Sequence, residues 1–247
     1  MRTRIAAFLL LIAPVVAASE VGVPLLTADV DITDQPSLQR GARLFVNYCL
    51  SCHSARFMRY NQMAKGLGLT EQQVQENLMF AADKVTEPLE VAMSSNDAKR
   101  WFGNPPPDLS VVARSRGADW LYTYLLTFYE DDNPTLPYGV NNLVFKDVGM
   151  PDVLWDRRGI QVPVYKEVKA DNGATTKVIE ALELQTPGSR TEEKFHRDMR
   201  DLVNFLVFLA EPAKATRYRL GLWVLFFLIL FFIVSYALYR EYWKDVH

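Results

Sequence analysis

The stretch Cys49-Leu50-Ser51-Cys52-His53 says more about this chain than any other part of the sequence. It has the spacing C-x-x-C-H, which is typical of the covalent attachment of a c-type haem. Two thiols three positions apart can each bond one haem vinyl group, and the adjacent histidine can bind the iron. Cys49 and Cys52 are also the only cysteines of the chain. The motif therefore predicts one covalent haem c, with His53 as an axial ligand of its iron.

A C-x-x-C pair can also serve as a redox dithiol, as half of a zinc site or as a plain disulfide. A dithiol of the thioredoxin kind should lie in a β-α-β pattern, and none is evident in the sequence. A zinc site would need two more ligands, and the remaining histidines, His196 and His247, are distant in sequence and lack ligand spacing. Haem attachment is favoured because the motif is complete, histidine included.

The N-terminus has the pattern of a secretory signal peptide. Arg2 and Arg4 are followed by an apolar run over residues 6–17, and Ala18 fits the last position before a cleavage site. An N-terminal membrane anchor is the alternative, but this run is short of the ~20 apolar residues that span a bilayer. The sequence thus predicts a signal peptide over residues 1–18 and export of the chain that follows it.

A second apolar stretch lies near the C-terminus, where Leu220 to Tyr239 form 20 residues without a charge. At about 1.5 Å per residue a helix of this length spans the hydrocarbon layer of a membrane. Aromatic residues near its ends suit the two membrane interfaces, and the surface is too apolar all round for a core helix. We therefore expect an exported domain over 19–213, a linker and transmembrane helix over 214–239, and a cytoplasmic tail over 240–247.

The predicted exported domain is large enough to be a single domain and has more acidic than basic residues. A negative surface suits a positively charged soluble partner and would speed its encounter at low salt. Simple solubility is an equally good explanation of a modest acidic excess. Nothing in the composition suggests nucleic-acid binding.

Periodicity and turn signals predict a mainly helical domain. Helices are expected over 37–48, 69–84, 94–101, 110–129 and 189–209, the second and the last with capping boxes at Thr70 and Ser189. Residues 161–184 alternate in part around Asp171-Asn172-Gly173 and predict a β-hairpin. The intervening segments 103–108 and 132–151 are rich in Pro, Gly and Asn, and we expect loops there.

The second axial ligand of the iron has several candidates, because methionine is a common partner of histidine and raises the reduction potential. Met150 lies in a loop between Gly149 and Pro151, from which its sulfur could reach the open haem face. The other candidates are less suited, since they either follow His53 too closely or read as core residues: Met58, Met63, Met79, Met93 and Met199. A histidine ligand also stays possible on spacing alone.

Several further motifs occur in one order along the chain. They are Tyr48–Ser54, Asp97–Gly103, Pro106–Ser110, Ala113–Gly117, Val148–Pro151 and the segment Phe205–Pro212 before the apolar span. With these motifs the chain resembles the cytochrome c1 family, the haem-bearing subunits of cytochrome bc1 complexes, over nearly all of its mature length. The resemblance implies a mostly helical class I c-type cytochrome domain with insertions, here including the hairpin, and one C-terminal membrane helix.

The resemblance also implies roles for individual residues. Met150 stands at the position of the family's axial methionine, and Arg116 at that of an arginine that pairs with a haem propionate. Pro107 and Trp120 fall at positions that line the haem pocket, although ordinary packing would explain both. The hairpin region is long for the family, and a disulfide that some relatives have near the haem is ruled out by the cysteine count.

The implied function is electron relay from a Rieske iron–sulfur protein to a soluble cytochrome c, beside cytochrome b in a dimeric quinol–cytochrome c reductase. The haem domain would lie on the periplasmic side of a bacterial inner membrane, and no residue would make or break substrate bonds. The acidic run Glu130-Asp131-Asp132 could steer a basic acceptor or simply be solvated. The alternatives are a cytochrome subunit of a terminal oxidase, a tethered electron shuttle without partner subunits, and an exported dithiol oxidoreductase.

Overall fold

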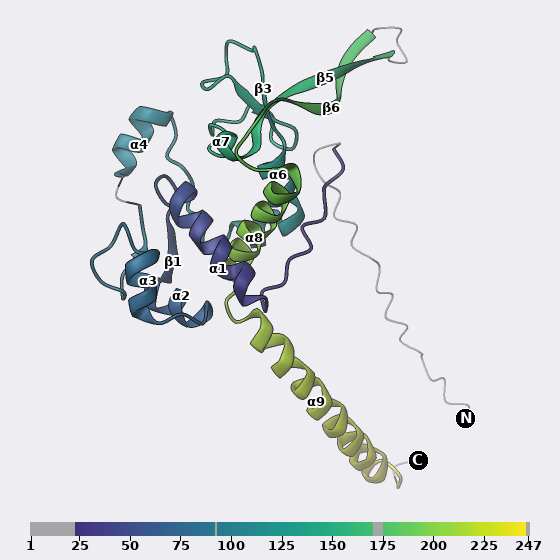
Figure 1. Cartoon of the computed structure of the whole chain (residues 1–247). Helices are drawn as coiled ribbons and strands as arrows, with labels where there is room; N and C mark the ends of the chain where they lie inside the picture. Colours follow the sequence, from purple (N-terminus) through teal and green to yellow (C-terminus); the bar gives the residue numbers. More distant parts are fainter. Residues whose placement is uncertain (1–22, 92, 170–174, 246–247) are drawn as a thin grey trace.

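The computed structural model describes residues 23–91, 93–169 and 175–245 (Figure 1). The predicted signal peptide over residues 1–18 lies outside the described residues. The same holds for the centre of the predicted hairpin and for the last two residues of the predicted C-terminal tail.

The described chain is mainly helical, with small two-stranded antiparallel sheets and one long C-terminal helix. In chain order the elements are α1 (Gln35–Leu44), the π-helical turn η1 (Phe45–Cys49), β1 (Ala55–Arg59), α2 (Tyr60–Gly66), α3 (Glu71–Asn77), β2 (Pro88–Leu89), α4 (Ser95–Phe102), α5 (Val112–Arg116), α6 (Ala118–Leu126), β3 (Phe128–Glu130), β4 (Val140–Asn142), α7 (Trp155–Arg158), β5 (Gly159–Lys169), β6 (Thr175–Pro187), α8 (Glu192–Ala210) and α9 (Lys214–Tyr242). The predicted fold class is confirmed.

The core forms where α1 packs against α8 (Figure 1). Gly41 permits the close approach of the two helices, because a Cβ at this position would lie 2.0 Å from the carbonyl oxygen of Asp201. One turn further on, the buried rings of Phe45 and Phe205 pack with their centroids 5.5 Å apart. The C-terminal end of α1 is therefore fixed on the core immediately before Cys49.

A buried polar cluster sets the rotation of α1 on α8. The carboxylate of Asp201 is almost fully buried and accepts hydrogen bonds from the Ser37 hydroxyl at 2.7 Å and from Nε of Arg40 at 2.5 Å. The amide of Asn204 donates to the same Ser37 hydroxyl at 3.0 Å and to the carbonyl of Asp31 at 2.7 Å. Buried polar groups stabilise a fold only when they are paired, so this cluster specifies one arrangement of the two helices.

The helix predicted over residues 69–84 is shorter than expected, since α3 ends at Asn77. The capping box at its start is confirmed, with Thr70 as the N-cap and reciprocal bonds to Gln73. Beyond Asn77 the chain must turn back, because Asn61 N–H donates to the carbonyl of Val85 and the next residues pair with β1 as strand β2. Pairing with a distant segment thus overrides the local helical pattern.

The region 110–129 forms two short helices, α5 and α6, as one of the two expected arrangements. Its end was predicted wrongly as helix, and part of the expected loop over 132–151 is strand. Phe128 to Glu130 form β3, which pairs with β4 over Val140–Asn142. The capping box predicted at Ser189 is also wrong, because the N-cap of α8 is Thr191 and its side chain makes no capping hydrogen bond.

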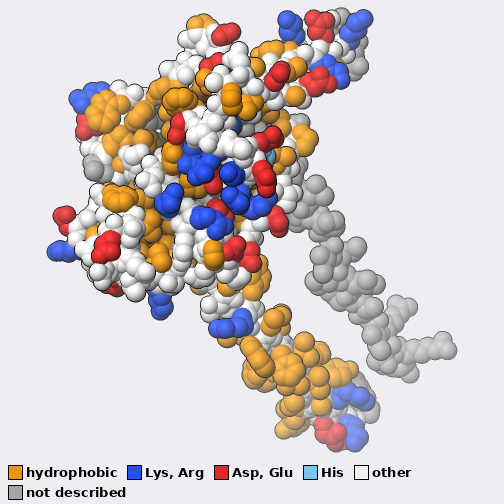
Figure 2. Space-filling view, viewed as in Figure 1, with side chains coloured by type: hydrophobic (Ala, Val, Ile, Leu, Met, Phe, Trp, Pro, Cys, Tyr) orange, Lys and Arg blue, Asp and Glu red, His pale blue; other side chains and the backbone are white. Residues whose placement is uncertain are grey.

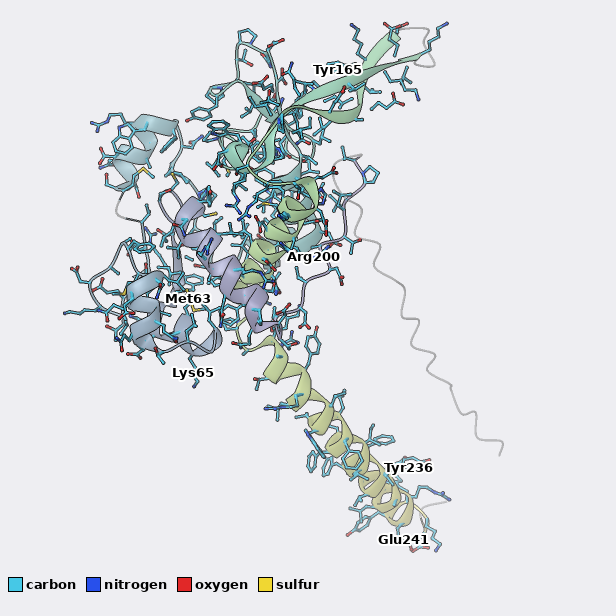
Figure 3. All side chains as sticks on the ribbon, in the orientation of Figure 1. Met63, Lys65, Tyr165, Arg200, Tyr236 and Glu241 are labelled. Atoms are coloured by element: carbon cyan, nitrogen blue, oxygen red, sulfur yellow. The ribbon has the colours of Figure 1, made fainter. Side chains whose placement is uncertain are left out.

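The predicted hairpin is confirmed as β5 and β6, which pair in antiparallel register from Gly159↔Pro187 to Lys169↔Thr175. Its base is tied to the body, since the side-chain amide nitrogen Nε2 of Gln161 donates to the backbone carbonyls of Leu126 and Phe128 at 3.0 and 2.9 Å. The outer half projects from the body, away from α9, with Tyr165 on the projecting part (Figures 1 and 3).

The last helix, α9, is 29 residues long and has a mean hydropathy of 2.6 over its most apolar window. None of that window is buried against the rest of the chain, so the alternative of a core helix is wrong. The helix extends away from the body as an apolar rod, with charged side chains gathered near its two ends (Figure 2). Tyr236 and Glu241 lie near that end (Figure 3). Length and composition suit a single-pass membrane anchor.

Candidate haem site

The C-x-x-C-H motif lies on one tight turn that follows α1. The backbone N–H groups of Cys52 and His53 both donate to the carbonyl oxygen of Cys49, at 3.0 and 2.8 Å. Both thiols are free and half-buried. The turn therefore presents two thiols and an imidazole within one short segment, and this donor set fits a group held by two thioether bonds and one nitrogen.

The surroundings of the two cysteines give little support to a redox dithiol or a zinc site. Burial, with a smaller contribution from Cys52, raises the pKa of the Cys49 thiol to about 12. A redox dithiol needs the opposite shift, because the thiolate is the reactive form. Within the described parts of the chain, no group of three or more His, Cys, Asp and Glu side chains could hold a metal ion. The surroundings favour neither thiolate exchange nor zinc.

The His53 ring is oriented by a single backbone contact. Its Nδ1 lies 2.8 Å from the carbonyl oxygen of Pro107. A carbonyl can only accept, so Nδ1 carries the proton and Nε2 carries the free lone pair. Burial lowers the pKa of His53, although the bond to Pro107 partly offsets this effect. The histidine is thus held as a neutral imidazole with Nε2 available to a metal, which is the usual arrangement of a ligating histidine.

The segment that carries Pro107 is bound along the chain that follows the motif. The N–H of Leu109 donates to the carbonyl of Ser54 at 2.8 Å, and the N–H of Arg56 donates to Asp108 at 3.1 Å. Burial alone would raise the pKa of Asp108, but hydrogen bonds from Ser110 and Arg56 hold it below its ordinary value. The predicted pocket residue Pro107 therefore has a defined role in the structure, which is to orient His53.

A second group of residues surrounds Met150. The hydroxyl of Tyr124, on α6, donates to the Met150 sulfur at 3.3 Å. The Tyr124 ring stacks on Trp120 with centroids 5.1 Å apart and meets Phe128 edge to face at 5.0 Å. Burial raises the pKa of Tyr124 well above its usual value, so the phenol keeps its proton. Met150 and Trp120 are half-buried, and the structure joins them through Tyr124.

Arg116 lies next to this aromatic group, at the end of α5. Its guanidinium carbon is 5.0 Å from the Trp120 ring centroid and 5.9 Å from that of Phe145. Among the ion pairs of the described residues none involves Arg116, and its side chain is exposed. The cation thus lies over aromatic faces, and no ion pair of the described residues occupies its N–H donors, which could bind an anionic group.

In the described parts of the chain, the two groups of predicted site residues have no direct polar or ring contact with each other. No hydrogen bond or ring contact among the described residues joins Cys49, Cys52, His53 or Pro107 to Arg116, Trp120 or Met150. They are connected through the segment after Met150, because Arg157 on α7 lies 5.4 Å from the ring centroid of Tyr48. The motif and the methionine loop are therefore parts of one folded unit.

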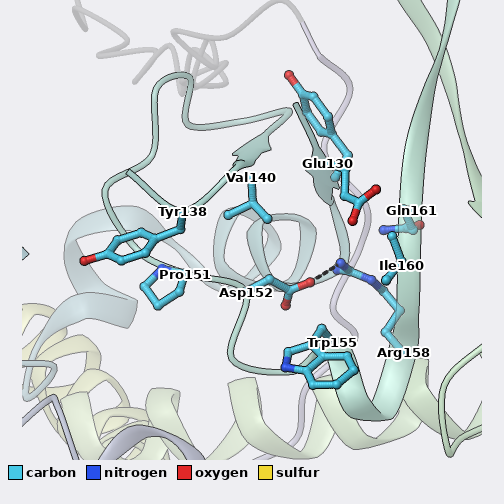
Figure 4. Close-up of a pocket in the computed structure, with 10 residues that line it drawn as sticks. Glu130, Tyr138, Val140, Pro151, Asp152, Trp155, Arg158, Ile160 and Gln161 are labelled. Atoms are coloured by element: carbon cyan, nitrogen blue, oxygen red, sulfur yellow. Dashed lines mark hydrogen bonds and ion pairs between the residues drawn. The ribbon is translucent and has the colours of Figure 1, made fainter. Parts of the chain in front are cut away.

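A hollow of about 390 Å³ lies beside the methionine loop (Figure 4). It is lined by Tyr129, Glu130, Tyr138, Val140, Pro151, Asp152, Trp155, Arg158, Ile160 and Gln161. Asp152 and Arg158 form an ion pair across its floor, and both side chains are more than nine-tenths buried. Burial raises the pKa of Asp152 and lowers that of Arg158, while each charge partly offsets the effect on the other. The pair ties the loop after Met150 to the end of α7, directly before β5.

Three parts of this arrangement could not be found from the sequence. Phe145 has no motif that points to the site, and the pairing of Asp152 with Arg158 depends on how α7 turns the chain. The hydrogen bond from Tyr124 to Met150 joins positions 26 apart in the chain, and no motif points to it. The spacing of aromatic residues on α6 could have indicated that Trp120 and Tyr124 stack. It gives no indication that the Tyr124 hydroxyl bonds to Met150.

The fold and the site together define the class of protein: a mainly helical C-x-x-C-H domain with a separate methionine group and one apolar C-terminal helix. Comparison with known proteins gives the family. The Cytochrome C1 family matches residues 28–246. The chain belongs to the cytochrome C1 family.

Individual relatives agree with this assignment. The chain is 46% identical to the cytochrome c1 of Allochromatium vinosum, over 98% of each chain. It is 45% identical to the protein named ammonia monooxygenase gamma subunit of Nitrosomonas europaea, over 96% of each chain. The cytochrome c1 of Rhodospirillum rubrum is 29% identical, over 86% of this chain and 83% of its own. The family consists of electron-transfer haem proteins of bc1-type complexes and implies a covalent haem c.

Proposed function

We propose that Cys49 and Cys52 attach the haem through two thioethers and that His53 and Met150 are its axial ligands. When bound, the haem supplies a one-electron redox centre. The observation that carries this proposal is the orientation of His53: its Nδ1 proton is committed to Pro107 at 2.8 Å, which leaves Nε2 for the iron. Beside it, two free thiols share the same turn, which suits covalent attachment.

The residues around Met150 would complete the site. A thioether from a loop suits the second axial position, because methionine with histidine gives the higher potentials of electron-transfer haems. Arg116 lies over the Trp120 ring and is in no ion pair of the described residues, so it would pair with a haem propionate. Trp120 would line the pocket through its stack with Tyr124. No residue of this chain is required to make or break a substrate bond.

The relay would run between two protein partners in a quinol–cytochrome c reductase. The chain would accept an electron from a Rieske iron–sulfur protein and pass it to a soluble cytochrome c, in a dimeric complex that also contains cytochrome b. Family membership supports this assembly, and α9 would hold the chain beside the other membrane subunits. The acidic run Glu130-Asp131-Asp132, at the end of β3, is the candidate surface for steering a basic acceptor.

The proposed topology follows from the signal sequence and α9. Residues 1–18 would be removed on export, and residues 19–213 would form the haem domain on the periplasmic side of a bacterial inner membrane. Residues 214–239 would link this domain to the membrane and cross it, and residues 240–247 would remain in the cytoplasm. The apolar, unburied surface of α9 supports a membrane position for this segment.

The ligand assignment can be tested by spectroscopy on the full chain. Oxidised haem with a methionine ligand has a weak sulfur-to-iron charge-transfer band in the near infrared. Met150→Leu should abolish this band, whereas Met199→Leu should keep it, because Met199 is fully buried in the core and leucine conserves its volume. A band that survives Met150→Leu would show that another residue is the ligand. Cys49→Ala and Cys52→Ala should each reduce covalent haem in the mass spectrum.

The partners can be tested by purification. A tag on the C-terminal tail should recover this chain from detergent-solubilised membranes together with a b-type haem spectrum and the electron paramagnetic resonance signal of a Rieske cluster. Recovery with copper or oxygen-reducing haem centres instead would support the terminal-oxidase alternative. Recovery of the chain alone, with its haem, would support a tethered shuttle.

A further inference from the structure

Tyr124 contacts the sulfur of the residue proposed as the second axial ligand, Met150. The Tyr124 hydroxyl donates to the Met150 sulfur at 3.3 Å. This contact is set by rigid surroundings, because the Tyr124 ring is stacked on Trp120 with an interplanar angle of 10° and is met edge to face by Phe128. The backbone carbonyl of Tyr124 also accepts a hydrogen bond of 2.8 Å from Asn142 on β4. The hydroxyl is therefore aimed at the sulfur by the fold.

We propose that Tyr124 tunes the reduction potential of the haem by donating a hydrogen bond to the sulfur of its axial ligand. The inference rests on the proposed function, since it requires Met150 to bind the iron. Tyr124 is a positioning residue in this account, because it acts on the iron only through Met150.

The direction of the effect follows from the two lone pairs of a thioether sulfur. One lone pair can bind a metal while the other accepts a hydrogen bond. The hydrogen bond withdraws electron density from the sulfur and makes it a weaker donor to the metal. Ferric iron depends on this donation more than ferrous iron does, so the bond from Tyr124 favours the ferrous state. Hydrogen bonds to ligand atoms are a recognised means by which proteins set such potentials.

The surroundings also leave the hydroxyl free for this role. Asp152 follows Met150 by two positions, and its carboxylate would be a stronger acceptor than a thioether. Its carboxylate is instead bound by Arg158, across the floor of the hollow beside the loop (Figure 4). The ion pair thus occupies the competing carboxylate, and the sulfur remains the hydrogen-bond partner that the structure gives to Tyr124.

The test is a redox titration of the intact complex with the variant Tyr124→Phe, which keeps the stacked ring and removes only the hydroxyl. Tyr122→Phe is the matched control, because Tyr122 lies on the same helix and its hydroxyl contacts Nδ1 of His196 at 3.0 Å. The hydrogen bond acts on both oxidation states, so only the part that differs between them appears in the potential. We expect the equilibrium constant for reduction to fall about threefold in Tyr124→Phe, which is a drop of ~28 mV.

The charge-transfer band provides the second readout. In Tyr124→Phe the band should persist and move in energy, whereas Tyr122→Phe should leave both band and potential unchanged. A wild-type potential in Tyr124→Phe with the band unmoved would overturn the inference while Met150 ligation stands. Absence of the band in the wild-type protein would overturn the ligand assignment, and the inference with it. An equal drop in both variants would also overturn it, because the effect would then not depend on the sulfur.

Discussion

The substitution Gly41→Ala tests how closely the haem motif depends on the packing of α1 against α8. A methyl group at this position would lie 2.0 Å from the Asp201 carbonyl oxygen and 2.8 Å from Cβ of Phe205. Both are atoms that cannot rotate away, so the helices must separate. Overpacking of this kind costs up to ~3 kcal/mol, and the better helix propensity of alanine returns about 1 kcal/mol. We expect a net loss of about 2 kcal/mol.

For a domain of this size, a loss of about 2 kcal/mol lowers the melting temperature by roughly 4–8 °C. Thermal unfolding of the purified protein in detergent, followed by far-ultraviolet circular dichroism, measures this shift. Gly149→Ala is the matched control, because a Cβ there meets nothing within 4 Å. Since α1 continues through η1 to Cys49, haem incorporation should fall as well. An unchanged or higher melting temperature for Gly41→Ala would refute the claim of close helix contact.

Three further substitutions probe the surroundings of the site. Arg158→Met leaves the buried carboxylate of Asp152 without its partner and should cost ~3 kcal/mol in denaturant unfolding. Arg116→Gln removes a positive charge beside Trp120 and should lower the midpoint potential in a redox titration, whereas Arg116→Lys should retain most of it. Asp108→Asn should lower stability at neutral pH, because the pKa of Asp108 is held below its unfolded value of about 3.9. The stabilisation by the ionised Asp108 is present above that value and is lost as pH falls through the folded pKa. The denaturant midpoints of Asp108→Asn and the wild type should therefore differ at about pH 7 and converge as the pH is lowered to about 3.

Each of these expectations has an opposite outcome. Full stability of Arg158→Met, compared with an exposed control such as Lys166→Met, would mean that the ion pair does not anchor the methionine loop. Equal midpoint potentials for Arg116→Gln and the wild type would show that this arginine does not lie close to the haem. A constant stability difference between Asp108→Asn and the wild type down to about pH 3 would show that the carboxylate titrates at its ordinary value.

Most of the helical framework was predictable because its signals are local. The capping box at Thr70, the break before Pro107 and the apolar run of α9 are each written within a few neighbouring residues. The helix over 69–84 was overestimated because the decisive contact comes from a distant segment, where Asn61 binds the carbonyl of Val85. The strands β3 and β4 were missed for the same reason, since three residues each are too few for a pattern.

In the candidate site, too, the residues were predictable from local signals and their contacts were not. Cys49, Cys52 and His53 were evident from spacing, and Met150 and Arg116 from a family resemblance. The contacts that orient these residues were not evident, because they join parts of the chain that are far apart. The carbonyl of Pro107 is 54 positions from His53, and the Tyr124 hydroxyl is 26 positions from Met150. Partners at such separations follow from the path of the folded chain and leave no mark in either segment alone.

The most direct test of the central claim is reduction of this haem by a quinol in the purified membrane complex. The c-type α band is followed in a stopped-flow instrument after addition of the quinol, with and without an inhibitor of the quinol-oxidation site. We expect fast reduction that the inhibitor abolishes. A haem that stays oxidised with the quinol but is reduced by a soluble cytochrome c would contradict it, because electrons would then enter from the soluble side, as in a terminal oxidase.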